Sequence, residues 1–211
     1  MSNVPRRLSA SAASAVGSFS LSADGVICGT AWPDPAARFA LSGGILDESE
    51  VLPMWGGVAI NELIPATPVN SPGAPIPELG GHIVRATTEA EIVGWSVFDQ
   101  NYAAINAPQS PVPQTANGGF VSYYRLGCGI RIAVPLDPAL ALEGAPVNAP
   151  VSWDFDNQWL TVGAAGLPVR VLRVWPGGCM APIYDGGPTA APPGQGFLDW
   201  DRNAAAAIIL L

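Results

Sequence analysis

The chain has 211 residues with nine basic and 17 acidic side chains, so its formal net charge is −8. All of the basic residues are arginines, and only 12% of the residues are charged, against about 25% in ordinary soluble domains. This balance excludes the basic surface that nucleic acids and anionic membranes require. The length suits one domain, or one domain with an arm.

The composition argues against two structural classes, a helical bundle and a disordered chain. The 24 glycines and 22 prolines interrupt nearly every stretch, which argues against a long helical bundle. Disorder is also excluded, because 49% of the residues are apolar and seven are tryptophans, enough to form a buried core.

The first residues imitate a secretion signal without completing one. Arg6 and Arg7 precede a charge-free stretch, residues 8–23, in which a serine recurs at nearly every second or third position. That stretch is too polar for the hydrophobic part of a signal peptide. No run of 18 apolar residues occurs, so we expect no membrane span.

We therefore predict an extended N-terminal arm, residues 1–20, followed by a β-rich domain, residues 21–211. The arm is too small and polar to bury a core of its own, and we expect it to become ordered against a neighbouring chain. Its candidate partner-binding residues are Arg6, Arg7, Leu8 and Phe19.

The first predicted strand covers residues 58–64 and ends at Pro65. Residues 65–77 contain five prolines and predict an extended surface loop. A second strand is expected at residues 91–98. Residues 100–119 predict another long loop, with a turn at its Asn-Gly pair, and a loop of that length is expected to contact something.

The second half of the chain predicts more strands. Two of them, residues 120–125 and 128–134, flank Gly127, and a turn is expected at residues 140–144. Residues 151–155 and 158–162 predict a hairpin with its turn at Asp156 and Asn157.

Residues 169–175 are the strongest predicted strand. The closing Ala-rich run, residues 204–211, could form a helix, but it is short and ends in Ile-Ile-Leu-Leu, so we favour a buried strand. The fold class that follows is all-β, a sandwich or barrel of short antiparallel strands with long Pro/Gly-rich loops and an extended N-terminal arm.

Catalytic motifs are scarce. His82 is the single histidine, and any Ser-His-Asp or Cys-His arrangement would have to use it. No Gly-x-Ser-x-Gly elbow and no phosphate-binding glycine loop occurs. We predict a structural or exposed loop histidine, and no catalytic or cofactor-binding residue.

The three cysteines, Cys28, Cys128 and Cys179, lie in small, apolar or Gly-rich surroundings without a Cys-x-x-Cys pair. Their odd number argues against a disulfide framework and a zinc site. We expect buried, reduced thiols, with a disulfide between two of them as the alternative. Synthesis in a reducing cytoplasm fits this pattern.

The carboxylates are the remaining candidates for catalysis or metal binding. Three pairs of them are spaced two residues apart, which places both members of a pair on one strand face. These pairs are Glu89 and Glu91, Asp154 and Asp156, and Asp199 and Asp201. The middle pair begins like a calcium loop, but Trp159 stands at the glycine position and Ala165 at the bidentate glutamate position. We expect ordinary turn acids and no metal site.

The last 40% of the chain contains a series of segments with a shared pattern: the strand GIRIAVP, then LEGAPV, then VSWD followed by QWLT, and the closing segment GFLDWDRNAAAAIILL, which occupy residues 129–135, 142–147, 151–154, 158–161 and 196–211. This series resembles the structural cement, or head decoration, proteins of tailed bacteriophages.

This resemblance implies a non-enzymatic protein of the virion, made in the host bacterial cytoplasm. It would bind the outer surface of the major capsid protein shell at capsomer junctions, as a homo-oligomer with a trimer preferred over a dimer. No cofactor is expected from the motifs present, and the net charge predicts no nucleic-acid or membrane partner.

Two other classes remain open. A carbohydrate-binding or host-adhesion module would expose tryptophans in a line on one face. A carboxylate-dependent glycosidase would need two acids roughly 5–9.5 Å apart in a cleft.

Overall fold

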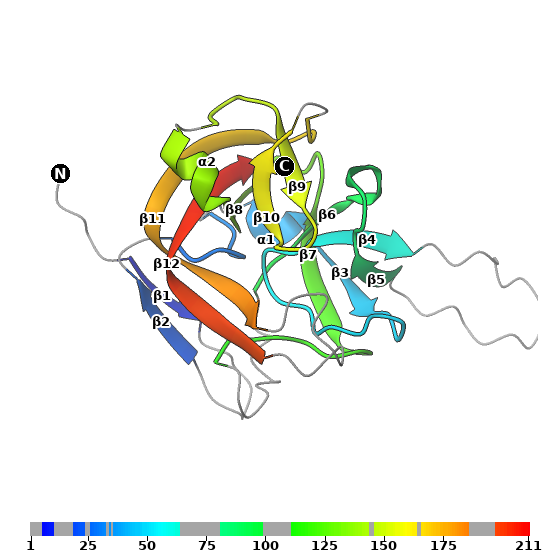
Figure 1. Cartoon of the computed structure of the whole chain (residues 1–211). Coiled ribbons are helices and arrows are strands. Elements are labelled where there is room, and N and C mark those ends of the chain that lie inside the picture. The colour runs from blue at the N-terminus through cyan, green and yellow to red at the C-terminus, as the bar shows by residue number, and fades with distance from the viewer. Residues whose placement is uncertain are drawn as a thin grey trace, which may run out of the picture.

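The computed structural model describes residues 6–10, 19–23, 26–32, 34, 36–63, 81–98, 111–143, 146–163, 166–185 and 197–211. Strands dominate these ranges, and they form one closed barrel, a three-stranded sheet and two hairpins (Figure 1). The predicted all-β class is therefore confirmed.

Five strands close the barrel in the order β3-β5-β4-β6-β7. Their bounds are Leu41–Leu46 (β3), Ala59–Leu63 (β4), Gly81–Arg85 (β5), Gly94–Ser96 (β6) and Phe120–Arg125 (β7). Strands β3 and β5 run parallel, and the other pairs are antiparallel. Closure pairs each of these strands on both sides and removes the sheet edge that an open arrangement would expose.

Ile60 and Ile83 of the barrel strands are 0% exposed and share one core cluster, whereas Trp95, also 0% exposed, packs on the other side of the strands in a second cluster with residues of the sheet and the hairpin. Gly94 shows how tightly the strands approach, because a Cβ there would lie 2.1 Å from the carbonyl oxygen of Tyr124. A larger residue at Gly94 would therefore push β6 away from β7.

A three-stranded sheet packs beside the barrel, with β12 (Phe197–Leu210) between β11 (Arg170–Asp185) and β8 (Arg131–Pro135). The alanines of residues 204–207 are all buried. Burial on both faces of β12 explains why this Ala-rich run is the predicted strand, since the small side chains let neighbouring layers approach closely.

Residues 26–32 join the two outer strands of that sheet. The Cys28 N–H donates to the Met180 carbonyl of β11 at 2.8 Å, and the Ala133 N–H of β8 donates to the Thr30 carbonyl at 3.0 Å. The same segment also reaches the barrel side, where the Phe98 N–H donates to the Gly29 carbonyl at 2.8 Å. One short segment thus fastens the sheet and the barrel together.

A hairpin of β9 (Val151–Asp154) and β10 (Trp159–Val162) covers the space between barrel and sheet. Trp153 of β9 packs edge-on against Trp95 of the barrel, with ring centroids 5.6 Å apart. The predicted hairpin and its turn are confirmed.

The N-terminal strands β1 (Arg6–Ala10) and β2 (Phe19–Ala23) form a separate antiparallel ribbon, which we call the N-terminal ribbon. Figure 1 shows it at the edge of the molecule, and β2 contacts β11. The boundary predicted at residue 20 falls inside β2, because the arm folds back and pairs with the residues that follow it.

The structure differs from the sequence predictions at two places. The strand expected over residues 91–98 is shortened to β6, because Glu91 accepts hydrogen bonds from the Thr87 and Thr88 N–H groups and closes the 3-10 turn Glu89–Glu91. The turn expected at residues 140–144 is replaced by a helix, α2 (Pro138–Glu143), which begins with proline in its first turn.

Other predictions were incomplete or lie outside the described residues. The strand expected at residues 169–175 extends to Asp185, and β3, β5 and the four-residue helix α1 (Ala37–Ala40) were not predicted. The loop at residues 65–77 and most of the loop at 100–119 fall outside the described ranges, but the turn at Asn117 is present, with Gly118 at φ 74°. Within the described ranges, no helix has the length and apolar character to span a membrane.

Candidate functional site

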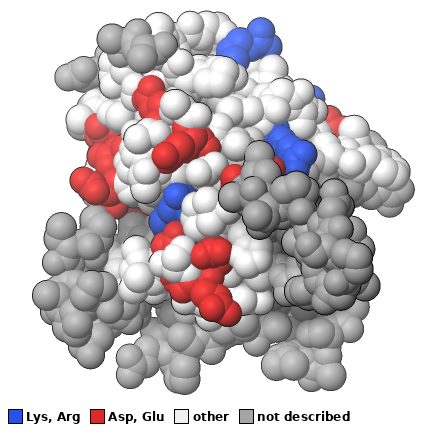
Figure 2. Space-filling view, turned by 90° about the vertical axis from the view of Figure 1, so that its right-hand side faces the viewer, with Lys and Arg blue, Asp and Glu red and all other residues white. Residues whose placement is uncertain are grey.

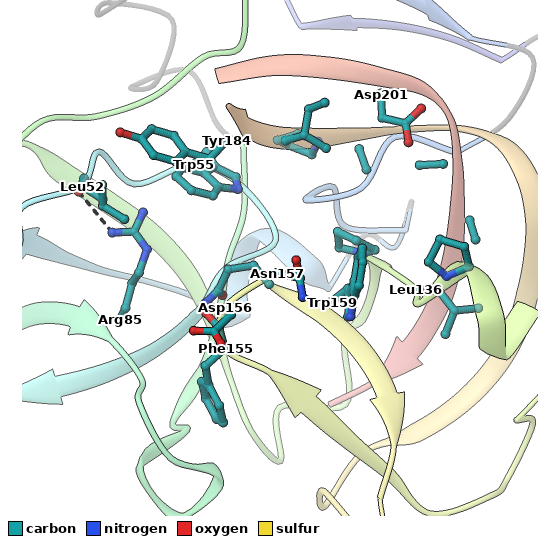
Figure 3. A pocket seen from close by; sticks show the side chains of 18 residues that line it. Leu52, Trp55, Arg85, Leu136, Phe155, Asp156, Asn157, Trp159, Tyr184 and Asp201 are labelled. Carbon is teal, nitrogen blue, oxygen red and sulfur yellow. Dashed lines mark hydrogen bonds between the residues drawn. The ribbon is translucent and has the colours of Figure 1, made fainter. Parts of the chain in front are cut away.

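A hollow of about 240 Å³ lies where the β9–β10 hairpin, the β11–β12 pair and the barrel meet, and we call it the junction pocket (Figure 3). Its walls come from distant parts of the chain, including Trp55, Arg85, Asp156, Tyr184 and Asp201. The volume is slightly below the range of pockets that enclose drug-sized ligands, so it suits a single side chain or a similarly small group.

The hairpin wall is fixed by Asp154. Its carboxylate accepts hydrogen bonds from the N–H groups of Asp156 and Asn157 and from the Asn157 side-chain amide, each at 2.9 Å. Burial acts to raise the pKa of Asp154, but the hydrogen bonds outweigh it and the pKa is lowered. Asp154 therefore orders the turn that presents Asp156 and Asn157, which is the role of turn acid predicted for it.

Gln158 attaches this turn to the barrel. Its side-chain amide donates to the Phe155 carbonyl at 2.7 Å, and its oxygen accepts from the Trp153 indole at 3.2 Å and from the Ala59 N–H of β4 at 3.3 Å. Gln158 is buried at φ 56°, in the left-handed region that non-glycine residues seldom adopt. Backbone strain of this kind persists where the surroundings hold it, and it concentrates at functional sites.

The barrel wall is organised around Arg85. Its guanidinium pairs with Glu50 at 2.7 Å and donates to the carbonyls of Leu52, at 3.2 Å, and Pro53. The two charged side chains are only 10% and 13% exposed. The positive charge of Arg85 is thus already neutralised on the pocket wall.

An aromatic stack completes this wall. The Arg85 guanidinium lies 4.7 Å from the ring centroid of Trp55, and Trp55 stacks on Tyr184 of β11 with centroids 6.1 Å apart and an interplanar angle of 9°. The stack joins the barrel to the long β11–β12 pair (Figure 3).

The remaining acids of the pocket are Asp156 on the hairpin side and Asp201 on the β12 side (Figure 3). Asp201 accepts a hydrogen bond from the Asn203 N–H at 2.8 Å. Within the part of the chain that the structure describes, neither carboxylate has a cationic partner. The pocket therefore carries two negative charges that its own walls do not balance.

His82 lies away from this pocket, paired with Asp47 at 2.6 Å between Nδ1 and Oδ2. The other oxygen of Asp47 accepts from the Ser49 N–H at 2.9 Å and from the Ser49 hydroxyl at 2.6 Å. These bonds, those of Ser49 first and that of His82 next, lower the pKa of Asp47 to about 2. The serine hydroxyl donates to the carboxylate, so this trio is a turn network and differs from a nucleophile–base arrangement.

The predicted partner-binding residues all lie in the N-terminal ribbon. Arg6, Arg7 and Leu8 of β1 stand opposite Ala23, Ser22 and Leu21 in the register, and Phe19 of β2 stands opposite Ala10. The ribbon thus brings the four residues together within one hairpin, separate from the junction pocket.

Tryptophans and cysteines are mostly structural. Four of the seven tryptophans, Trp55, Trp95, Trp153 and Trp200, are buried, and Trp32, Trp159 and Trp175 are partly buried. The three cysteines are free, as predicted, with Cys28 and Cys179 buried and Cys128 partly exposed. Burial raises the pKa of the Cys28 and Cys179 thiols.

The junction pocket was not predicted from the sequence. The Asp-Phe-Asp-Asn turn and the spacing of Asp199 and Asp201 singled out two of its acids, but nothing local relates either of them to Arg85 or Tyr184. Among the described residues, no group of three or more His, Cys, Asp or Glu side chains could hold a metal ion.

Comparisons with protein-family models, with curated proteins and with solved structures found no match for this chain.

Proposed function

We propose that the chain is a non-enzymatic structural protein of a tailed-phage head. It binds the outer surface of the major capsid protein shell at capsomer junctions, as a homo-oligomer with a trimer preferred, and stabilises the shell. The observation that carries this proposal is the N-terminal ribbon, a two-stranded element at the edge of an all-β body (Figure 1).

The ribbon has an unpaired strand edge within the described residues. Strand β1 pairs with β2 through five residues, and no other strand pairs with β1. A free edge offers backbone N–H and C=O groups in a row, and extended segments use such rows to add to a neighbour's sheet. This places the candidate contact residues Arg6 and Arg7 on an element suited to reach another chain.

The described surface of the body carries few charged side chains, which suits a permanent contact with another protein. On the face in Figure 2, charged side chains form isolated patches within a mostly uncharged described surface. Large apolar side chains stand exposed, with Phe39 at 79%, Val162 at 63% and Val51 at 62%. Contiguous exposed apolar surface favours association with a partner, and these side chains are candidates for such a surface.

The network at His82 supports a structural role. The single histidine, its carboxylate partner and the nearby serine hold the turn after β3, and the carboxyl groups of Asp47, Glu91 and Asp154 all have lowered pKa values. A general acid in a glycosidase needs the opposite shift. The burial of four of the seven tryptophans likewise does not favour the carbohydrate-binding alternative.

The test is binding of the purified chain to heads that lack it, from the virus that encodes it. We expect saturable co-sedimentation, with density for the chain over capsomer junctions in a particle reconstruction. Deleting residues 2–20 should lower occupancy and leave the isolated body folded by circular dichroism. Unchanged occupancy after the deletion would remove the ribbon from the proposal, and absence of binding by the intact chain would overturn the proposal itself.

A further inference from the structure

The junction pocket has walls of a kind that select a flat cation. Aromatic and apolar side chains, among them Trp159 and Phe155, make most of its surface, and Asp156 and Asp201 supply two carboxylates. Aromatic faces attract cations through the ring quadrupole, and carboxylates bind guanidinium groups with paired hydrogen bonds. The pocket combines both kinds of attraction.

The charges around the pocket also favour a cationic ligand. Arg85, the basic residue among the pocket's lining residues, is satisfied by Glu50 at 2.7 Å, so it neutralises neither pocket acid. Asp156 is exposed and Asp201 half-buried, and they lie on opposite walls of the pocket (Figure 3), so an entering cation would pair with one of them while covering apolar surface. A neutral ligand would balance neither charge.

The hairpin wall of the pocket is held by hydrogen bonds of its own. Asp154 and Gln158 order the turn that precedes Trp159 and carries Asp156, and the left-handed Gln158 is held by three hydrogen bonds. A preformed wall loses little entropy when a ligand binds to it.

We propose that the junction pocket binds the guanidinium group of an arginine that a partner polypeptide presents on an extended segment. Arginine fits better than lysine, because its planar group can stack on an aromatic wall such as Trp159 while it donates paired hydrogen bonds to a carboxylate. Arginines seated in aromatic pockets are frequent energetic centres of protein interfaces. In the head-stabilising role the partner would be a shell subunit, but the chemistry of the pocket does not depend on that role.

The experiment titrates the blocked tripeptide acetyl-Gly-Arg-Gly-amide into the ¹⁵N-labelled full chain and follows the indole N–H signal of Trp159, assigned with Trp159→Phe. The matched probe replaces arginine with citrulline, which keeps the shape and loses the charge. We expect saturable binding of the arginine peptide with a dissociation constant of about 1 mM, and at least tenfold weaker binding of the citrulline peptide.

Two variants test whether the arginine peptide binds in the junction pocket. The double variant Asp156→Asn, Asp201→Asn should weaken the arginine peptide at least tenfold, while Asp199→Asn, the same change on an exposed acid of β12 that does not line the pocket, should leave it unchanged. The retained spectrum of each variant shows that it folds.

Equal affinities for the arginine and citrulline peptides would overturn the proposal. Equal losses of affinity for the arginine peptide in the pocket variant and in the Asp199 control would also overturn it. No saturable shift with either peptide would overturn it too. Selective binding of a neutral methyl glycoside in the same titration would replace it with the host-adhesion alternative. None of these outcomes decides whether the chain binds heads, so this test and the particle test can fail separately.

Discussion

Glu50, which pairs with a residue of the pocket wall, and Asp156, which lines the pocket, are acids from two regions of the molecule that the structure uses differently. Glu50 is nearly buried and pairs with Arg85 at 2.7 Å, whereas Asp156 is exposed and has no cationic partner among the described residues. Acids on the barrel side stabilise the fold itself, as Asp47 does in its turn. The unpaired acids of the pocket add little to the fold and are available to a partner.

Removing a barrel-side acid should therefore have the largest effect. Glu50→Gln removes the carboxylate charge that pairs with the largely buried Arg85 guanidinium, and breaking a pair of this kind costs roughly 3–5 kcal/mol of unfolding free energy. Urea unfolding followed by circular dichroism measures the loss. Glu48→Gln, two residues away on an exposed side chain, is the control and should change little. A loss below about 1 kcal/mol for Glu50→Gln would remove the distinction between the two sets of acids.

Gln158 tests how firmly the pocket turn is held. Gln158→Ala leaves the Trp153 indole N–H and the Ala59 N–H without their acceptor, and we expect a loss of about 1–3 kcal/mol. Gln158→Gly loses the same bonds but relieves the left-handed backbone, so it should be about 1 kcal/mol more stable than the alanine variant. If the glycine variant proves equal to or weaker than the alanine variant, the turn is not strained.

The pairing of Asp47 should make the stability of the protein depend on pH. Its pKa of about 2 lies below the ordinary value of 3.8, so its contribution to stability is present above about pH 4 and is lost as the pH falls toward 2. Carboxyl-carbon NMR titration should show the low pKa directly. Asp47→Asn should flatten this part of the stability profile, and a pKa near 3.8 in the folded protein would contradict the hydrogen bonds from Ser49 and His82.

The pocket acids should give the smallest effect on stability. Asp156→Asn and Asp201→Asn each remove a charge that no described cation balances, so we expect changes within about 0.5 kcal/mol, of either sign. The same urea unfolding series measures them. A loss near that of Glu50→Gln would show that these acids are structural after all.

The sequence predicted the parts of this arrangement that are local. The β9–β10 hairpin, the turn at Asp156 and the β12 strand all follow from residue order, because alternation and turn residues act over a few positions. The 3-10 turn at Glu91 was missed because a capping carboxylate outweighed a weak strand pattern.

The junction pocket depends on contacts between distant segments, which local patterns do not contain. Glu50 and Arg85 are 35 residues apart in the chain, and Trp55 reaches Tyr184 only after the barrel and the β11–β12 pair have packed. The spacing of Asp199 and Asp201 predicted a shared strand face, but only the packed fold shows that Asp201 lines a pocket.

The head-stabilising function is tested by thermal release of DNA from paired particles, with and without the chain, at low and high salt. A ligand of the assembled shell stabilises the shell by mass action. Salt weakens the attraction between exposed charges, because the screening length falls to about 3 Å at 1 M. Contacts dominated by apolar and main-chain groups should therefore persist at high salt. We predict that particles lacking the chain release DNA at a lower temperature under both conditions. Superimposable release curves would contradict the proposed function.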